Sequence, residues 1–372
     1  MSTLLFNWKK AANYFYDGSK KSIFDNTQSS FIFVFAISCS LLGVGFSFLG
    51  LMINGWTLAS ILSDPLIISG QFAAIRGNAG VNYGFYGMLG TMFTYTTSVI
   101  CGLIFNRIKR YSVRFFLVII AFLPGGSMMV IQSSKLIFLI SVCFFIGALL
   151  LSRLYANKNK IFSVKAVFNI GLTILLVTPF IFFSIISREH YGDLEPSALI
   201  ANLTYAINSY IFGQIYAFSD FFSYYLEMPS KSKFYIDSDS YGAYTFYSVL
   251  NLFGFSKEFI PGLYIESGYV DGVFETNIFT IFRGVINDFG IIGSFVFFGL
   301  AGLVVNYTFY KMLYRRESII RGLFFVGVFV AMVISYLVSV FMARYMYSTL
   351  FLTYIILKVY ELLHSKRIRS KN

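Results

Sequence analysis

The chain has 372 residues, of which 57% are hydrophobic and only 12% are charged. A soluble globular domain carries roughly 25% charged residues, so this composition excludes an ordinary soluble enzyme and indicates a membrane protein. The net charge of +12 does not indicate nucleic-acid binding, because the Lys and Arg residues lie in short segments between apolar stretches, where membrane topology explains them better.

Apolar stretches long enough to cross a bilayer alternate with polar segments along the chain. We predict an all-α membrane protein in which residues 1–372 form one domain with about eight spans and both termini in the cytoplasm. The predicted spans are about 31–53, 84–105, 115–131, 136–151, 166–187, 289–309, 322–341 and 345–362.

Glycine and proline mark special positions inside these spans. Pro124, followed by two glycines, predicts a kinked or broken helix in the third span. Small residues let helices approach closely in a membrane. Four glycines are therefore expected at close helix contacts, namely Gly90, Gly102, Gly299 and Gly302.

Charge is sorted between the two alternating sets of polar segments. One set holds 21 of the 29 Lys and Arg residues and only 4 of the 17 acids, whereas the other holds 8 basic residues and 13 acids. Bacterial inner-membrane proteins keep their basic loops in the cytoplasm, so the second set is predicted to face the periplasm. The arginines on that outer side are Arg76, Arg188, Arg283 and Arg344.

The longest polar region, residues 188–277, is predicted to be a large periplasmic loop. Its segment 198–226 is apolar enough to resemble a span. Counting it as one would invert every later loop and place the basic C-terminus outside, so we expect a re-entrant or interfacial helix. The remainder of the loop is rich in Tyr and Gly, as in surfaces that stack on sugars, although such tyrosines also suit a lipid interface.

The outer polar segments are where chemistry is expected. No nucleotide-binding loop is visible, and with two histidines in the whole chain a His-rich metal site is excluded. A transporter would place ionisable residues in mid-span, and the predicted spans contain almost none. Because neither a nucleotide-binding loop nor a cluster of histidines is visible, no cofactor is expected.

The chain resembles the O-antigen polymerases of the Wzy type. The resemblance rests on the outer-loop stretch GQFAAIRGNAGVNYGFYG, on GGSMMVIQSSKLIFLI, on SREHYGD with SYGAYTFYSVLNLFG, and most strongly on TNIFTIFRGVINDFGIIGSFVFFGLAG. It implies a glycosyltransferase that joins oligosaccharide repeat units carried on undecaprenyl pyrophosphate, at the periplasmic face of the bacterial inner membrane. It also implies contacts with membrane lipids and with polysaccharide assembly proteins such as a chain-length regulator.

Under this resemblance the outer arginines Arg76, Arg188, Arg283 and Arg344 would bind the pyrophosphate, since a guanidinium binds phosphate through two parallel hydrogen bonds. One of Glu189, His190 and Asp193 would remove the proton from the acceptor hydroxyl. Each arginine also has a structural alternative: Arg283 could pair with Asp288, Arg188 could snorkel, Arg76 could fix its loop and Arg344 could cap a helix.

Two other functions remain open. An O-antigen ligase has a similar architecture and also uses outer arginines and a histidine, and His190 fits that chemistry. A flippase for lipid-linked oligosaccharides would normally show more spans and charges within them. The sequence does not indicate the sugars joined, the linkage or the kind of surface polysaccharide.

Overall fold

The computed structural model describes residues 2–16, 30–65, 67–72, 84–132, 134–156, 171, 200–201, 204–205, 207–227, 242–254, 268–270, 273–276, 279–314, 318–337, 339 and 344–369. Within these ranges, six helices are long and apolar enough to cross a membrane: α2 (Ser30–Ile53), α5 (Gly84–Phe105), α6 (Tyr111–Gln132), α7 (Lys135–Tyr155), α12 (Ile281–Tyr314) and α14 (Arg344–Arg369, through its stretch Arg344–Leu363). A multi-pass α-helical membrane protein fits this composition. The expected span 166–187 lies outside the described residues, apart from position 171.

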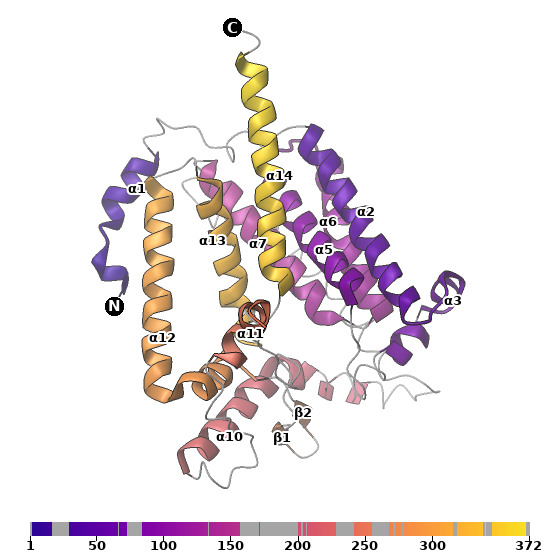
Figure 1. Ribbon diagram of the computed structural model, residues 1–372, viewed down its shortest axis with the longest axis vertical. Coiled ribbons are helices and arrows are strands. Elements are labelled where there is room, and N and C mark those ends of the chain that lie inside the picture. Colours follow the sequence, from indigo (N-terminus) through magenta and orange to yellow (C-terminus); the bar gives the residue numbers. More distant parts are fainter. Residues whose placement is uncertain are drawn as a thin grey trace.

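The smaller elements gather at the two ends of the helix bundle (Figure 1). At its lower end in the figure lie α3, α10, α11 and a two-stranded antiparallel hairpin, and we call this the hairpin end. The opposite end, where α14 finishes, is called the tail end. The bounds of the smaller elements are η1 (Ser2–Leu5), α1 (Trp8–Tyr16), α3 (Leu58–Ser63), η3 (Ser209–Gly213), α10 (Gln214–Glu227), α11 (Ala243–Leu252), β1 (Gly268–Val270), β2 (Phe274–Thr276) and α13 (Ile319–Ile334).

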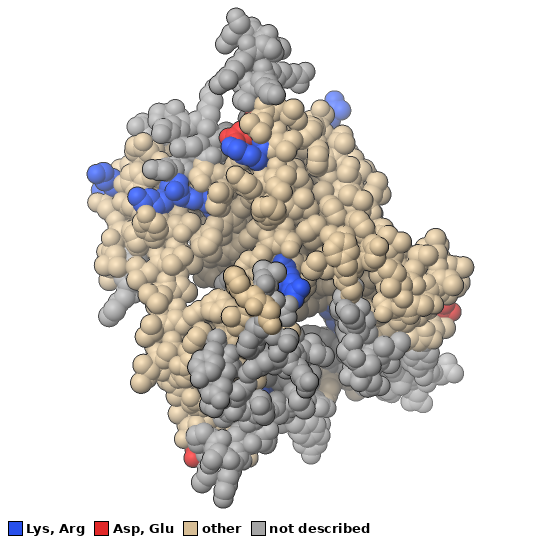
Figure 2. Space-filling model, in the orientation of Figure 1, with Lys and Arg blue, Asp and Glu red and all other residues tan. Residues whose placement is uncertain are grey.

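The charged residues of the described chain are sorted between these two ends. Figure 2 shows most of the Lys and Arg side chains of one face in its upper part, towards the tail end. By their positions in the helices, the described basic residues at or near the tail end are Lys9, Lys10, Arg107, Lys109, Arg110, Arg114, Arg153, Lys311, Arg321 and Lys358. Those of the described ranges at the hairpin end are Lys135, Arg283 and Arg344. The basic and acid-rich polar segments that alternate in the sequence therefore correspond to different ends of the bundle, and most described Lys and Arg residues lie at the tail end.

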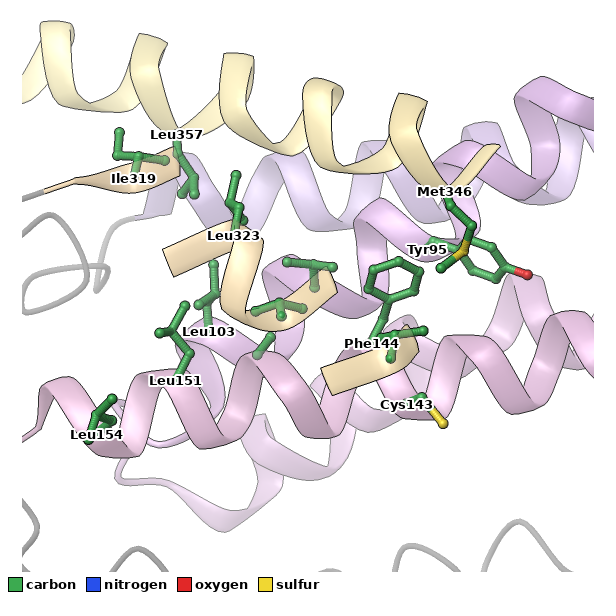
Figure 3. Close-up of a cluster of buried hydrophobic side chains, with 14 of the residues drawn as sticks. Tyr95, Leu103, Cys143, Phe144, Leu151, Leu154, Ile319, Leu323, Met346 and Leu357 are labelled. Carbon is green, nitrogen blue, oxygen red and sulfur yellow. The ribbon is translucent and has the colours of Figure 1, made fainter. Parts of the chain in front are cut away.

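The helix α5 forms the centre of the bundle and packs against α2, α6, α7 and α14. Two clusters of buried side chains flank it. One joins α5 to α7, α13 and α14, and Figure 3 shows its members Tyr95, Phe144, Leu323 and Met346. The other joins α5 to α2 and α6 through residues such as Ile100. Opening the space around α5 would therefore disturb both clusters.

Glycine allows two of the helix crossings on α5. A Cβ at Gly90 would lie 2.9 Å from Ser47 Oγ, and one at Gly102 would overlap the carbonyl oxygen of Phe145 on α7. These two predicted contacts are confirmed. The prediction for Gly299 is wrong, because a Cβ there would meet nothing within 4 Å. For Gly302 it stays a prediction.

The helix α6 runs unbroken through Pro124, so the break predicted as one alternative is wrong, whereas the kink stays a prediction. Proline has no N–H, and the carbonyl four residues earlier, that of Ile120, loses its usual donor. Ser40 Oγ on α2 donates to this Ile120 oxygen at 3.0 Å. The neighbouring helix thus satisfies the carbonyl that the proline leaves open, which keeps the helix intact in a region without water.

Replacing this serine is expected to destabilise the bundle. Ser40→Ala leaves the Ile120 carbonyl without that donor, and a buried unsatisfied group costs about 1–3 kcal/mol. In a Pro124→Ala background the loss should shrink, because the substituted alanine restores the backbone donor. Thermal unfolding of the purified protein, followed through exposure of the buried Cys39, Cys101 and Cys143, measures both effects.

The control for this experiment is Ser47→Ala on the same helix. Ser47 is as buried as Ser40, but its hydroxyl donates to the Gly43 carbonyl of its own helix at 2.6 Å. We expect a smaller change in melting temperature for Ser47→Ala. Equal shifts for the two serine variants would contradict the assigned role of Ser40.

The N-terminal helix α1 lies along the tail end of α12. Trp8 packs against Phe309 at 5.9 Å between ring centroids, and Tyr14 against Tyr314 at 5.1 Å. Phe15 reaches α7 through Tyr155 at 5.4 Å. Lys9 and Lys10 on the same helix are exposed. This amphipathic helix therefore ties α12 to the rest of the bundle at the end where basic residues gather.

The helix α13 is shorter than predicted. It ends at Ile334, whereas the sequence predicts a span over 322–341. The residues Ser335–Leu337 form a turn, and the Ser335 carbonyl accepts a hydrogen bond at 3.0 Å from the N–H of Ile281, at the start of α12. This tertiary contact helps to end the helix, and no glycine or proline near residue 335 indicates it.

Candidate functional site

A short helical arm forms the base of the candidate site. The first residues of α12, Ile281–Phe289, lie at the hairpin end and turn into the membrane-spanning part at Gly290 (Figure 1). Gly290 has φ 65° and ψ −179°, a conformation essentially restricted to glycine. The predicted start of this span at residue 289 coincides with the bend, although the helix itself begins eight residues earlier. The arm carries both Arg283 and Asp288.

Arg283 is enclosed between aromatic rings. Its side chain is 0% exposed, and its Cζ lies 4.1 Å from the ring centroid of Phe279 and 5.1 Å from that of Phe221 on α10. A desolvated cation over an aromatic face gains about 2 kcal/mol. The arginine therefore fastens α10 to the arm, and in this conformation its side chain is not open to solvent.

The position of Arg283 is electrostatically unusual. It lies in the first turn of α12, which has no acidic residue, although a helix N-terminus disfavours positive charge. Burying a charge costs several kcal/mol more unless its contacts offset it. The guanidinium and the positive end of the helix dipole thus lie close together at the start of α12.

Asp288 holds the helix α11. Its Oδ1 accepts from the backbone N–H of Tyr244 at 3.1 Å, and its Oδ2 accepts from that of Thr245 at 2.6 Å. These N–H groups belong to the first turn of α11, where the helix itself provides no acceptor, and a carboxylate there also complements the helix dipole. Asp288 therefore has a structural role, in which both carboxylate oxygens fix the start of α11.

Several buried polar residues around the arm were missed by the sequence analysis. Asn287 is 6% exposed and lies one turn after Arg283 on the same helix face, and Thr280 is 7% exposed. The spacing of four residues between Phe279, Arg283 and Asn287 could have indicated a shared face. The approach of Phe221 from α10 to Arg283 had no local signal in the sequence.

Arg344 contrasts with Arg283 because it is exposed. It is the first residue of α14, and its carbonyl accepts from Ser348 Oγ at 3.1 Å. The next residue, Tyr345, packs edge-on against Tyr95 of α5 at 5.7 Å. Contacts with the core thus hold the start of α14, and the guanidinium of Arg344 is accessible at the hairpin end.

The structure brings two of the seven predicted site residues to one end of the bundle, namely Arg283 and Arg344. The Ile281–Ser335 hydrogen bond and the short connection from α13 to α14 tie their helices together there. The remaining predicted residues, Arg76, Arg188, Glu189, His190 and Asp193, lie outside the described residues. Within the described ranges, no three His, Cys, Asp or Glu side chains come together as metal ligands would.

The described residues 207–227 are helical, as predicted for this segment, and its re-entrant or interfacial placement stays a prediction. In this segment the π-helical turn η3 leads directly into the 14 residues of α10. Figure 1 shows α10 below the spanning helices, beside the arm of α12. Ala217 and Phe221 pack on Phe279 and Ile286.

Comparison with known proteins adds no relative. The chain matches no protein-family model, no curated protein and no solved structure.

Proposed function

We propose that the protein is a membrane-embedded glycosyltransferase that polymerises oligosaccharide repeat units carried on undecaprenyl pyrophosphate, at the periplasmic face of a bacterial inner membrane. The observation that carries the proposal is the placement of Arg283 and Arg344 at the hairpin end, while most described basic residues lie at the opposite end. The resemblance to O-antigen polymerases supplies the substrate class. The hairpin end is then the periplasmic side.

The proposed reaction needs no nucleotide. The acceptor hydroxyl attacks the anomeric carbon of the donor sugar, the bond from that carbon to the pyrophosphate oxygen breaks, and the lipid pyrophosphate leaves with the electron pair. A base takes the hydroxyl proton, and Glu189, His190 and Asp193 remain the proposed candidates. Arginines stabilise the charge that grows on the pyrophosphate.

The two described arginines suit different tasks. The exposure of Arg344 supports direct contact with the pyrophosphate. The burial of Arg283 between Phe279 and Phe221 supports a positioning role, in which it holds α10 against the arm of α12. Arg76 and Arg188 remain proposed phosphate ligands.

Deletion of the gene in its native host tests the function, with surface polysaccharide separated on a gel. A single repeat unit on the lipid A core without the ladder would support a polymerase. Bare core with polymer retained on the carrier lipid would indicate a ligase. Bare core without polymer would indicate a flippase, and an unchanged ladder would contradict all three.

The arginine at the start of α14 should be needed for activity and not for folding. Hydrogen bonds to charged groups contribute about 1.5–3 kcal/mol, so Arg344→Ala should slow polymerisation roughly 10- to 100-fold with little change in melting temperature. Arg344→Lys should keep part of the ladder. The assay is complementation of the deletion strain at equal expression, and Arg110→Ala, an exposed arginine at the tail end, is the control. A full ladder with Arg344→Ala would remove this residue from the site.

A further inference from the structure

Two hydroxyl groups of α11 are buried without a hydrogen bond. The side chains of Thr245 and Ser248 are 0% and 1% exposed. In the part of the chain that the structure describes, neither hydroxyl has a hydrogen-bond partner, and neither oxygen has enough accessible surface for a water molecule to touch it. An unsatisfied buried hydroxyl costs free energy, and native proteins keep few of them. The presence of two in one short helix therefore needs an explanation.

Most buried hydroxyls in the other helices are satisfied by their own backbone. Thr91 and Thr353 donate to the carbonyl four residues earlier, at 2.9 and 2.8 Å. Ser248 makes no such contact, because α11 is interrupted at Phe246, whose φ of −120° and ψ of 25° are not helical. Thr245 lies in the first turn of α11, so no helical carbonyl precedes it. The partner of both hydroxyls must therefore come from outside the helix.

The helix α11 is attached to the arm that carries the candidate site. It packs on α12, and the backbone N–H groups of Tyr244 and Thr245 donate to the carboxylate of Asp288. Asp288 follows Arg283 by five residues, which corresponds to about 7.5 Å along the arm. The two hydroxyls thus belong to the same assembly as the buried arginine, at the end of the bundle where the proposed reaction takes place.

A hydroxyl group is uncharged and both donates and accepts hydrogen bonds, so it suits a sugar hydroxyl better than a pyrophosphate, which arginines bind. We infer that α11 binds the saccharide part of the substrate through the hydroxyls of Thr245 and Ser248. Both are covered in this conformation, so α11 has to shift before a ligand reaches them. The missing hydrogen bonds destabilise only the covered conformation, which lowers the cost of that shift. This inference rests on the proposed function and assigns its sugar-binding residues.

Removal of an unsatisfied hydroxyl should stabilise the protein. Thr245→Val and Ser248→Ala should each raise the melting temperature of the purified chain by about 2 °C, because an apolar side chain needs no hydrogen bond when buried. Thr353→Val is the control, since it makes the same change at an equally buried hydroxyl that has a partner, and it should lower the melting temperature. A fall for both α11 variants would overturn the inference. Ser248→Ala, the smaller change, decides if Thr245→Val fails to fold.

The rise in melting temperature with added ligand then measures binding. The probe is the single oligosaccharide repeat unit of the host, released from its lipid by mild acid. Each α11 variant should bind it about 2- to 10-fold more weakly than the wild type, as expected for one lost hydrogen bond, and should give a fainter ladder in the deletion strain. Binding of inorganic pyrophosphate should stay unchanged in these variants, whereas Arg344→Ala should weaken it.

Wild-type affinity of both α11 variants for the oligosaccharide would overturn the inference. A wild-type protein that binds pyrophosphate and not the oligosaccharide would overturn it as well. The proposed function fails by a different result, because an unchanged ladder after deletion of the gene contradicts the polymerase whatever the α11 variants bind. Loss of the ladder on deletion, combined with unaltered oligosaccharide binding by the variants, contradicts the role of α11 alone.

Discussion

Gly290→Ala is expected to disconnect the hairpin-end assembly from the membrane-spanning part of α12. At φ 65° and ψ −179° an L-residue with a Cβ is strained by about 1–3 kcal/mol. Space is not the obstacle, because the nearest atom to a Cβ there is Tyr225 Oη at 3.8 Å. The chain can relieve the strain by straightening the bend, which would swing the arm away and carry Arg283 and Asp288 with it.

The expected phenotype of Gly290→Ala is a severe loss of the polysaccharide ladder with a moderate fall in melting temperature. Gly299→Ala is the control, since it lies in the same helix, has open space around it and gains helix propensity of up to about 1 kcal/mol. Complementation and thermal unfolding measured side by side distinguish the two variants. A Gly290→Ala protein with normal stability and a normal ladder would show that the bend is not required.

Gly102→Leu is expected to prevent formation of a stable bundle. A Cβ at residue 102 would overlap the Phe145 carbonyl oxygen and lie 2.9 Å from Ala148 Cβ and 3.2 Å from Leu149 N. These are backbone and short side-chain atoms of α7 that cannot rotate away, so the helices α5 and α7 must separate. Overpacking costs about 1–3 kcal/mol where the core can adjust, and more is expected here because both clusters around α5 would open.

The amount of monodisperse protein recovered by size-exclusion chromatography, together with its melting temperature, measures this effect. Gly102→Ala should already lower both quantities, and Gly102→Leu should abolish recovery. Gly45→Leu, which adds the same side chain where nothing lies within 4 Å, should behave like the wild type. Comparable recovery of the Gly102 and Gly45 variants would mean that the crossing is looser than the structure indicates.

The bounds of a helix could be predicted from the sequence wherever the length of an apolar stretch alone determines them. The predicted spans 31–53 and 84–105 agree with α2 and α5 to within one residue, because a long apolar segment must satisfy its own backbone inside a bilayer. The helices α6 and α7 extend beyond their apolar stretches, since a helix can continue into water after the hydrocarbon ends. Where a tertiary contact sets the boundary, as at Ser335, the prediction was wrong by several residues.

The candidate site was less predictable than the spans, because contacts between distant segments determine it. The block containing Arg283 and Asp288 was recognised from the sequence, but the partners of both residues come from α10 and α11. Phe221 precedes Arg283 by about 60 residues, and no local periodicity connects the two. Burial of the guanidinium is therefore a property of the folded chain, whereas the exposure of Arg344 follows from its place at a helix start.

The position of α1 has a consequence for the order in which the protein matures. Trp8 and its partner Phe309 are about 300 residues apart in the chain, so their contact forms only after α12 has been made, whereas Phe15 can pack on Tyr155 of α7 earlier. Contacts between distant segments form late because a long loop must close first. The packing of α1 on α12 is therefore a late step of assembly, and the contact of α1 with α7 can precede it.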